Sequence, residues 1–172
     1  QLLTFVASIA VVESIQKNAG LKTKIKWPND VHYKGKKLCG ILTEGVFGRN
    51  NYVIVGIGLN VNQKNFPNDI KNTAASLRTI KHRLFNIEEI MNDIISRFFN
   101  LYENYYNKNK MDRILKIWEK YCDTINKDVT AATRKGKVSG KATGIDKDGN
   151  LLLKLKSNKI MKIIEGDISI RY

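Results

Sequence analysis

The sequence has few of the residues that form covalent or metal cross-links, with only two cysteines in 172 positions. Cys39 and Cys122 are far apart, and neither belongs to a Cys-x-x-Cys pair. A disulfide framework and a zinc site are therefore both unsupported, and we expect no metal-ligating residues. Cysteine usage of this kind fits a reducing, cytoplasmic setting best.

Long hydrophobic runs are also missing. No apolar stretch is long enough to span a bilayer. Residues 1–12 are apolar, but they lack a basic leader and a small-residue cleavage site, so they predict a packed helix rather than a signal peptide. We therefore expect no membrane association.

Acidic residues are scarce relative to basic ones, with 16 Asp and Glu against 30 Lys and Arg, which gives a net charge of +14. Such a charge predicts attraction to nucleic acid, nucleotide phosphates or an acidic protein partner. Because the basic residues are spread along the whole chain, we expect most of them to form solvated surface. A basic nucleic-acid-binding module is one alternative. However, residues 125–171 contain no aromatic side chain, so the stacking platforms of single-strand binders are missing and DNA binding is not supported.

The length predicts one domain with a small appendage. Apolar residues at helical spacing over 2–12 predict a helix, and the Asn18-Ala19-Gly20 stretch predicts its end. Alternation over 22–27, and apolar runs over 38–46 and 52–62, predict strands. Short strands in hairpin connection after a helix indicate an α+β fold with a largely antiparallel sheet.

The second half of the chain predicts helices and then short strands. Asn86, with Glu89 three residues later, is a capping-box pattern that opens a helical stripe to about Tyr105, and a second amphipathic helix follows over 111–121. From about Ile125, short strands separated by turns predict a small β-barrel. We therefore expect two domains, 1–124 and 125–172.

One stretch concentrates polar chemistry. Lys26-Trp27-Pro28-Asn29-Asp30 reads as a strand broken by a turn, and Lys37-Leu38-Cys39-Gly40-Ile41 opens the next strand. A turn that gathers an amide, a carboxylate and lysines is a candidate site for an anionic ligand. A β-turn with solvated lysines is the alternative interpretation.

A glycine-rich strand follows, Gly56-Ile57-Gly58-Leu59-Asn60. It is not a dinucleotide fingerprint, because it lacks the third glycine and no helix opens after it. Alternation places Gly56, Gly58 and Asn60 on one face, which leaves bare backbone where a flat ligand can approach closely. The opposite face carries apolar residues for packing: Val53, Val55, Ile57, Leu59 and Val61.

Gly40 and Leu42 share a strand face and are expected to line the same slot as the glycines. Strict alternation would put Lys37 on the face opposite Gly40. We therefore expect either that Lys37 precedes the regular strand or that a β-bulge separates the two residues.

Three motifs in this order, KWPND, KLCGILTE and GIGLNVN, resemble the catalytic half of biotin protein ligases, and Phe66-Pro67 and Thr73-Ala74-Ala75-Ser76-Leu77 follow where that family carries them. The resemblance implies a class II synthetase-like or biotin–lipoate ligase-like domain, with a mixed, largely antiparallel sheet packed with helices, and then an SH3-like barrel. It also implies an ATP-dependent enzyme that makes biotinyl-5′-adenylate and transfers biotin to a lysine. Lipoate ligases, which do parallel chemistry, fit these motifs less well.

The resemblance also implies ligands and partners. Biotin and ATP are the substrates, Mg²⁺ accompanies ATP, and the acceptor is the biotin carboxyl carrier domain of a biotin-dependent carboxylase, with a homodimer possible. Lys37 would contact the biotin carboxylate and the α-phosphate, and Asp30 would orient or deprotonate the acceptor lysine. The remaining residues are assigned to biotin (Gly40, Leu42, Gly56, Gly58) and to ATP or the adenylate (Lys26, Asn29, Asn60).

The sequence departs from the family pattern at its start. Biotin protein ligases carry a Gly-Arg-Gly-Arg-x-Gly loop upstream of the first helix, and here no two arginines lie close together. Gln1 falls in the region after that loop. We therefore expect the chain to be an N-terminally truncated piece with inefficient adenylation of its own.

Overall fold

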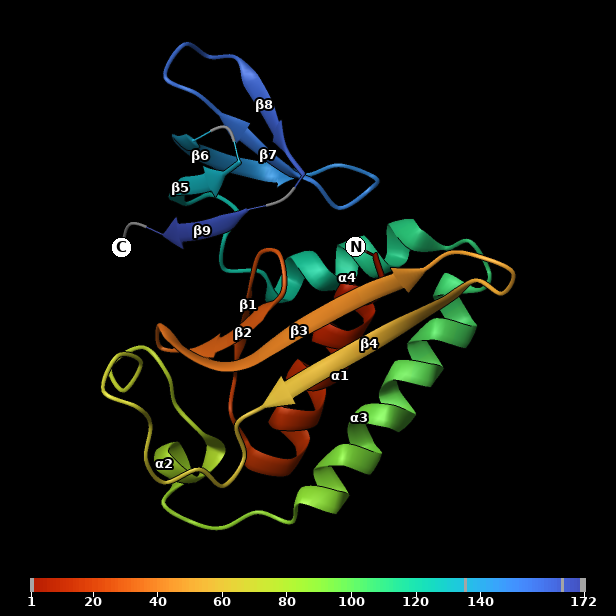
Figure 1. Ribbon diagram of the computed structural model, residues 1–172, viewed down its shortest axis with the longest axis vertical. Helices are drawn as coiled ribbons and strands as arrows, with labels where there is room; N and C mark the ends of the chain where they lie inside the picture. The colour runs from red at the N-terminus through yellow and green to blue at the C-terminus, as the bar shows by residue number, and fades with distance from the viewer. Residues whose placement is uncertain (1, 135, 165, 171–172) are drawn as a thin grey trace.

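The computed structural model describes residues 2–134, 136–164 and 166–170, so Gln1, Lys135, Glu165, Arg171 and Tyr172 lie outside it. The described chain forms two antiparallel sheets, one packed with helices and one of short strands (Figure 1). This arrangement confirms the predicted α+β class. No helix in the described part is long and apolar enough to cross a membrane.

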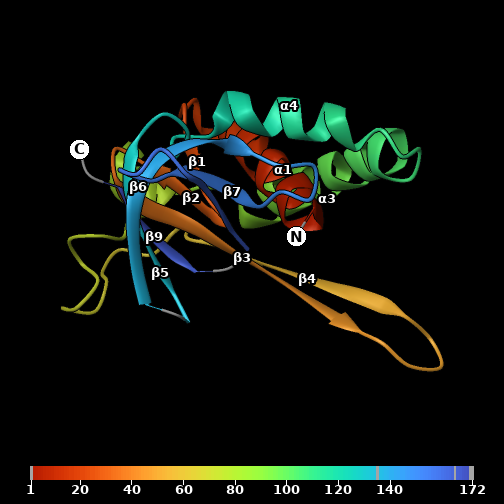
Figure 2. The same cartoon turned by 90° about the horizontal axis from the view of Figure 1, so that it is seen from above.

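The first sheet has four strands in sequence order. They are β1 (Lys24–Lys26), β2 (Asp30–Tyr33), β3 (Lys36–Val46) and β4 (Tyr52–Leu59), and each pairs antiparallel with the next. Alternation in β1 is as predicted, because Thr23, Ile25 and Trp27 are buried while Lys22 and Lys24 are exposed. The predictions missed β2, whose four residues follow directly on the turn after Pro28. The β3–β4 hairpin extends away from the rest of the molecule (Figure 2).

Helix α1 (Leu2–Ala19) lies behind the first sheet (Figure 1). The helix itself was predicted. Its apolar spacing, however, predicted burial along one face only, whereas every residue from Thr4 to Val12 is buried. The sheet covers one side of α1, and α3 and α4 cover others, which excludes water from nearly its whole circumference. The ring of Phe5 stacks on that of Trp118 at 4.3 Å between centroids.

The remaining helices follow the sheet in sequence. Helix α2 (Leu77–Lys81) is short, and its N-cap Ser76 accepts a hydrogen bond from the Thr79 N–H. Helix α3 (Ile87–Leu101) opens on the predicted cap Asn86, then continues through one π-helical turn, η1 (Tyr102–Tyr106). Helix α4 (Met111–Tyr121) matches its predicted bounds.

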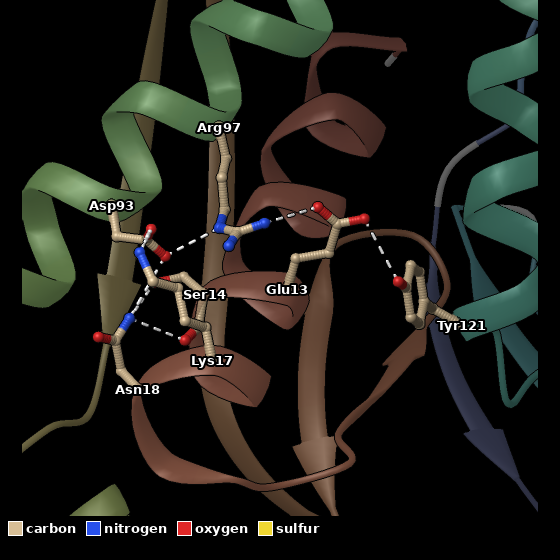
Figure 3. Close-up of polar contacts among 7 residues, drawn as sticks. All are labelled: Glu13, Ser14, Lys17, Asn18, Asp93, Arg97 and Tyr121. Atoms are coloured by element: carbon tan, nitrogen blue, oxygen red, sulfur yellow. Dashed lines mark hydrogen bonds and ion pairs between the residues drawn. The ribbon is translucent and has the colours of Figure 1, made fainter.

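A polar cluster ties α1, α3 and α4 together (Figure 3). The Asp93 carboxylate accepts hydrogen bonds from Lys17 Nζ at 2.7 Å and from Arg97 Nε at 2.8 Å. Arg97 Nη1 also donates to Glu13 Oε2 at 3.0 Å, and the Tyr121 hydroxyl donates to Glu13 Oε1 at 3.3 Å. The cations hold the pKa of Asp93 at about 2, against the effect of its burial.

The second sheet is built from five short strands. These are β5 (Asp128–Thr133), β6 (Gly136–Ile145), β7 (Leu151–Lys154), β8 (Ile160–Ile163) and β9 (Asp167–Ile170), in the spatial order β8-β7-β6-β5-β9. Every pairing is antiparallel. The number and length of the strands fit the predicted SH3-like unit, although no pairing among the described residues closes the sheet into a barrel.

Trp27 connects the two sheets. Its backbone N–H donates to Thr124 Oγ1, and its indole Nε1–H donates to the Gly149 carbonyl, both at 2.9 Å. Gly149 has a φ of +84°, and a β-carbon there would lie 3.0 Å from the Phe5 ring. The small sheet is therefore fixed against Trp27, the first residue of the β1–β2 turn.

Candidate active site

The two faces of the first sheet have different environments. Ile25, Val31 and Cys39 belong to the back face, which is buried toward α1. Cross-strand partners share a face, so one row of the front face runs across all four strands as Lys26, Asp30, Gly40 and Gly58. Leu42 and Gly56 form the next pair. Strand pairing thus brings six of the residues predicted for the site onto one surface.

A β-bulge brings Lys37 to the same face. Cys39 pairs with Val31, but His32 pairs with Lys37, so Leu38 is an extra residue in β3. A β-carbon at Gly40 would lie 3.2 Å from both Cε and Nζ of Lys37, which places the ammonium over Gly40. Lys37 lies inside β3 rather than before it, so the first of the two expectations was wrong and the bulge is correct.

Lys37 and Asp30 form an ion pair at the centre of this face. Lys37 Nζ lies 2.6 Å from Asp30 Oδ1, with the lysine side chain 52% exposed and the aspartate side chain 21% exposed. Asp30 Oδ1 is buried and makes no hydrogen bond within the described chain, so its contact is the ammonium itself. Lys26 is the cross-strand neighbour of Asp30 on the other side. The carboxylate therefore lies between two lysines.

The three glycines form a strip of bare backbone beside this ion pair. Gly56 and Gly58 are exposed, and Leu42 is 60% exposed at the edge of the strip. A β-carbon at Gly58 would meet only the Gly40 carbonyl oxygen, at 3.6 Å, and one at Gly56 would meet Leu42. The strip is thus open surface. On the opposite face the expected packing is incomplete, because Ile57 and Leu59 are half-buried while Val53 is exposed.

The two candidate asparagines donate to the backbone. Asn29 Nδ2 donates to the Ile41 carbonyl at 2.7 Å, and the Ile41 N–H donates to the Asn29 carbonyl at 3.0 Å. Asn60 Nδ2 donates to the Ala75 carbonyl at 3.1 Å. Both amides therefore hold main chain next to the site, which is a positioning role that sequence patterns did not indicate.

Residues 73–75 run alongside Lys37 as a short strap. The Lys37 N–H donates to the Thr73 carbonyl at 2.7 Å, and the Ala75 N–H donates to the Lys37 carbonyl at 2.9 Å. These two bonds satisfy the backbone N–H and carbonyl of Lys37 at the bulge, and they fix the position of its Cα. The motif Thr73-Ala74-Ala75-Ser76-Leu77 was the sequence signal for this segment, but its contact with Lys37 was not foreseen.

A polar cavity of about 360 Å³ is lined by both members of the ion pair and by none of the three glycines of the strip. Residues from both sheets line it, and five of them were not among the predicted site residues: His32, Gly35, Thr73, Ser169 and Ile170. The full lining is Lys26, Asp30, His32, Gly35, Lys37, Thr73, Ser169 and Ile170. The contribution of β9 shows that the small sheet forms one wall of the candidate site.

Two titratable groups at the site stay neutral. Burial, with a smaller contribution from the negative charge of Asp30, raises the pKa of the Cys39 thiol to about 12, so Cys39 is a packing residue and not a nucleophile. Burial also lowers the pKa of His32, whose Nε2 lies 3.6 Å from Asp123 Oδ2. The charges that a ligand meets at the front face are therefore those of the lysines and Asp30.

Two family models match the chain. Residues 1–62 match the biotin/lipoate A/B protein ligase family, and residues 124–171 match the biotin protein ligase C-terminal domain. The chain is 39% identical over 172 residues to the bifunctional ligase/repressor BirA of Bacillus subtilis, covering 98% of this chain and 52% of that protein. It is also 38% identical over 78 residues to the biotin–[acetyl-CoA-carboxylase] ligase of Mycobacterium tuberculosis, covering 44% of this chain and 27% of that protein.

A solved structure shares the fold. The biotin protein ligase of Aquifex aeolicus in complex with biotin and ATP superposes with a TM-score of 0.86 at 26% identity, covering 99% of this chain and 71% of that one. The chain spans about half the length of the Bacillus relative that it matches. The motifs, both family models and this fold agree, and the chain belongs to the biotin protein ligase family.

Proposed function

We propose that this chain is part of an ATP-dependent biotin–protein ligase, divided into a catalytic portion (1–124) and an SH3-like portion (125–172). The observation that carries the proposal is the Lys37 ammonium, seated over Gly40 and 2.6 Å from Asp30 on the open face of the sheet. An ammonium, a carboxylate and a flat strip of backbone suit a reaction that joins a carboxylate to a phosphate and then to an amine.

The first step makes biotinyl-5′-adenylate. A carboxylate oxygen of biotin attacks the α-phosphorus of ATP, the bond from that phosphorus to the bridging oxygen breaks, and pyrophosphate leaves. Negative charge builds up on the α-phosphoryl oxygens, and a fixed cation in the site stabilises it. Lys37 is the residue for this role, because its side chain is half-exposed and can reach a ligand on the glycine strip. Gly40, Leu42, Gly56 and Gly58 would contact biotin.

The second step transfers the biotinyl group. The amine of the acceptor lysine attacks the acyl carbon, the bond from that carbon to the phosphate oxygen breaks, and AMP leaves as the amine loses a proton. In the free protein the Asp30 carboxylate is occupied by Lys37. Once a phosphate gives Lys37 another anion to contact, Asp30 becomes available to orient the acceptor amine or accept its proton.

Lys26 lies next to Asp30 and lines the polar cavity, which supports a contact with ATP phosphates. Asn29 and Asn60 would reach the adenylate while their amides keep the backbone contacts already described. Among the described residues, no cluster of three or more His, Cys, Asp and Glu side chains is arranged for a metal. Mg²⁺ would therefore enter with ATP, bound mainly by phosphate and water.

The acceptor in this proposal is the biotin carboxyl carrier domain of a biotin-dependent carboxylase, and the setting is the cytoplasm, where the free thiols of Cys39 and Cys122 would stay reduced. Homodimer formation stays a prediction that sedimentation measurements can test. A lipoate ligase is the second candidate function. Residues 1–62 match a family that includes lipoate ligases, so the binding experiment below also uses a lipoyl-adenylate analogue.

Calorimetric titration of the 172-residue chain with a non-hydrolysable biotinyl-adenylate analogue tests the proposal. We expect binding, and we expect Lys37→Ala to weaken it by about 10- to 100-fold, because a hydrogen bond to a charged group contributes about 1.5–3 kcal/mol. Lys36→Ala is the matched control, because Lys36 is the exposed neighbouring lysine and should change little.

Equal effects of the two substitutions would rule out the role of Lys37. A preference for the lipoyl-adenylate analogue would favour the second candidate. Asp30→Asn should leave binding of the analogue nearly unchanged, because its proposed role belongs to the transfer step.

A further inference from the structure

The loop that joins β6 to β7, residues 146–150, is built around one carboxylate. Asp146 Oδ1 accepts hydrogen bonds from the Asp148 N–H at 2.9 Å and from the Asn150 N–H at 3.0 Å. The Asn150 side-chain amide donates to both oxygens of Asp146 at 3.1 Å, and Lys162 Nζ of β8 lies 2.5 Å from Oδ2. Asp146 therefore fixes the shape of this loop.

The loop turns one backbone carbonyl toward the catalytic part of the chain. Gly149 is buried, and its carbonyl is the acceptor for the Trp27 indole. The Gly149 N–H donates to the Asp146 carbonyl, and the Asp146 N–H donates to the Asn150 carbonyl, both at 2.9 Å. The direction of the Gly149 carbonyl is thus set by a turn whose other hydrogen bonds end on Asp146.

Trp27 lies where this loop meets the first sheet. β1 is the outermost strand of that sheet, and the segment that joins α4 to β5 runs along its outer edge. Ile25 forms a parallel bridge with Cys122, and the Ile25 carbonyl accepts a hydrogen bond from the Asp123 N–H at 2.8 Å. The Trp27 side chain is 1% exposed, so its indole N–H depends on the Gly149 carbonyl rather than on water.

Trp27 also belongs to the turn that carries the proposed adenylate contacts. It directly follows Lys26, and Asn29 and Asp30 come two and three positions later. The Asn29 amide and carbonyl are held on β3 by their hydrogen bonds with Ile41. A shift of the Trp27 ring therefore moves backbone from which three proposed site residues extend. A misplacement of about 1 Å, even by a change far from the reacting atoms, can lower the rate of an enzyme by about 10²-fold.

We propose that Asp146 is a positioning residue for the adenylate site: it holds the Gly149 carbonyl on the Trp27 indole, and Trp27 holds the turn between β1 and β2. This inference rests on the proposed function, because the site that is positioned is the one assigned to biotinyl-adenylate. Asp146 touches no ligand and acts through Trp27. The small sheet thus contributes to the site by this route as well as through Ser169 and Ile170, which line the polar cavity.

The alternative is that Asp146 stabilises only the small sheet. Its loss would then lower the free energy of unfolding, but the folded variant would keep the environment of the Trp27 indole and the affinity for the adenylate analogue. The two roles differ in the properties of the folded variant. Each variant is therefore measured at a temperature well below its thermal midpoint, which circular dichroism determines.

The test compares two alanine substitutions in the same loop of the 172-residue chain. Asp146→Ala removes the acceptor that organises the loop, whereas Asp148→Ala removes an exposed carboxylate two residues away and gives the same change in net charge. The probe is the non-hydrolysable biotinyl-adenylate analogue, titrated by calorimetry. We expect Asp146→Ala to bind it about tenfold more weakly, because the buried indole donor loses its fixed partner, and Asp148→Ala to stay within about twofold.

Two further measurements separate positioning from stability. Asp146→Asn keeps a side-chain oxygen that can accept from the N–H groups of residues 148 and 150, so its affinity should return to within about threefold of the unsubstituted chain. In proton–nitrogen NMR spectra, the Trp27 indole N–H should exchange with solvent faster in Asp146→Ala, while that of Trp118 should change less. Trp118 is buried against Phe5, and Trp27→Phe assigns the two indole signals.

A double-mutant cycle tests whether Asp146 acts through Trp27. Trp27→Phe removes the donor and should weaken analogue binding to a similar degree, and adding Asp146→Ala should lower the affinity by less than about twofold more. Trp27→Phe also decides the outcome if Asp146→Ala does not fold, because it breaks the same contact from the other side. In that case a loss of affinity in Trp27→Phe supports the proposal, and normal affinity overturns it.

The outcomes distinguish this inference from the proposed function. If the unsubstituted chain binds the analogue, the inference is overturned by normal affinity in Asp146→Ala, by equal losses in the two loop variants, or by full additivity with Trp27→Phe, and the proposed function stands. Faster exchange of the Trp27 indole with normal affinity would make Asp146 a structural residue only. If the unsubstituted chain does not bind the analogue, both are refuted.

Discussion

Substitution of Gly40 by alanine is a sharp test of the site geometry. The new β-carbon would lie 3.2 Å from Cε and Nζ of Lys37 and 3.8 Å from Asp30 Oδ1. Carbon atoms in good contact are about 3.5–4.0 Å apart, so the end of the lysine side chain must move by a few tenths of an ångström. The methyl group would also stand between the ion pair and the glycine strip. Gly40→Ala therefore tests the site by displacing the Lys37 ammonium.

The effect on stability should be small. The end of Lys37 is flexible and its side chain is 52% exposed, so moving it costs little. Replacing a strand glycine by alanine also stabilises the folded chain by about 0.5–1 kcal/mol, because alanine loses less backbone freedom on folding. We expect the free energy of unfolding of Gly40→Ala to stay within about 1 kcal/mol of the unsubstituted protein in urea denaturation.

The effect on ligand binding should be much larger. We expect the affinity for the biotinyl-adenylate analogue to fall by about 10- to 100-fold, which corresponds to about 1.4–2.7 kcal/mol. Gly144→Ala is the matched control, because no atom lies within 4 Å of a β-carbon there and the position is in the small sheet. An affinity within about twofold of the unsubstituted protein, with normal stability, would refute the idea that Lys37 acts from above Gly40.

Two further predictions concern stability. Trp27→Phe removes the indole donor to the Gly149 carbonyl, at a position where the side chain is buried, and should lower the free energy of unfolding by about 1–3 kcal/mol in urea denaturation; an unchanged midpoint would contradict the role of Trp27 in connecting the sheets. Asp93→Asn should cost on the order of 2 kcal/mol at pH 7, because the folded-state pKa of Asp93 is about 2, below its usual 3.8. Since that pKa is lowered on folding, the contribution is present above pH 3.8 and is lost as the pH falls toward 2. Chemical denaturation across that range should show the two proteins converging, whereas Asp69→Asn, at an exposed loop position, should track the unsubstituted chain throughout.

Several features of the fold could be predicted because their signals are local. The period of about 3.6 residues identified α1, α3 and α4, and alternation identified the buried face of β1. The Asn86 cap depends on side-chain hydrogen bonds to N–H groups two and three residues ahead, so it too is visible in sequence. The full burial of α1 was not, because it depends on two other helices packing against the sides away from the sheet.

The candidate site also has features that the sequence predicts and features that depend on tertiary packing. The motifs alone determined the family and which residue types the site contains: the lysine, the aspartate and the glycines. Only the tertiary structure decided that Leu38 is the extra residue, because a bulge is a mismatch in register between β2 and β3 that neither strand specifies by itself. It also decided that the Asn29 and Asn60 amides donate to backbone carbonyls and that β9 forms one wall of the cavity. These contacts join segments far apart in the chain, so their geometry exists only once the sheets and helices have packed.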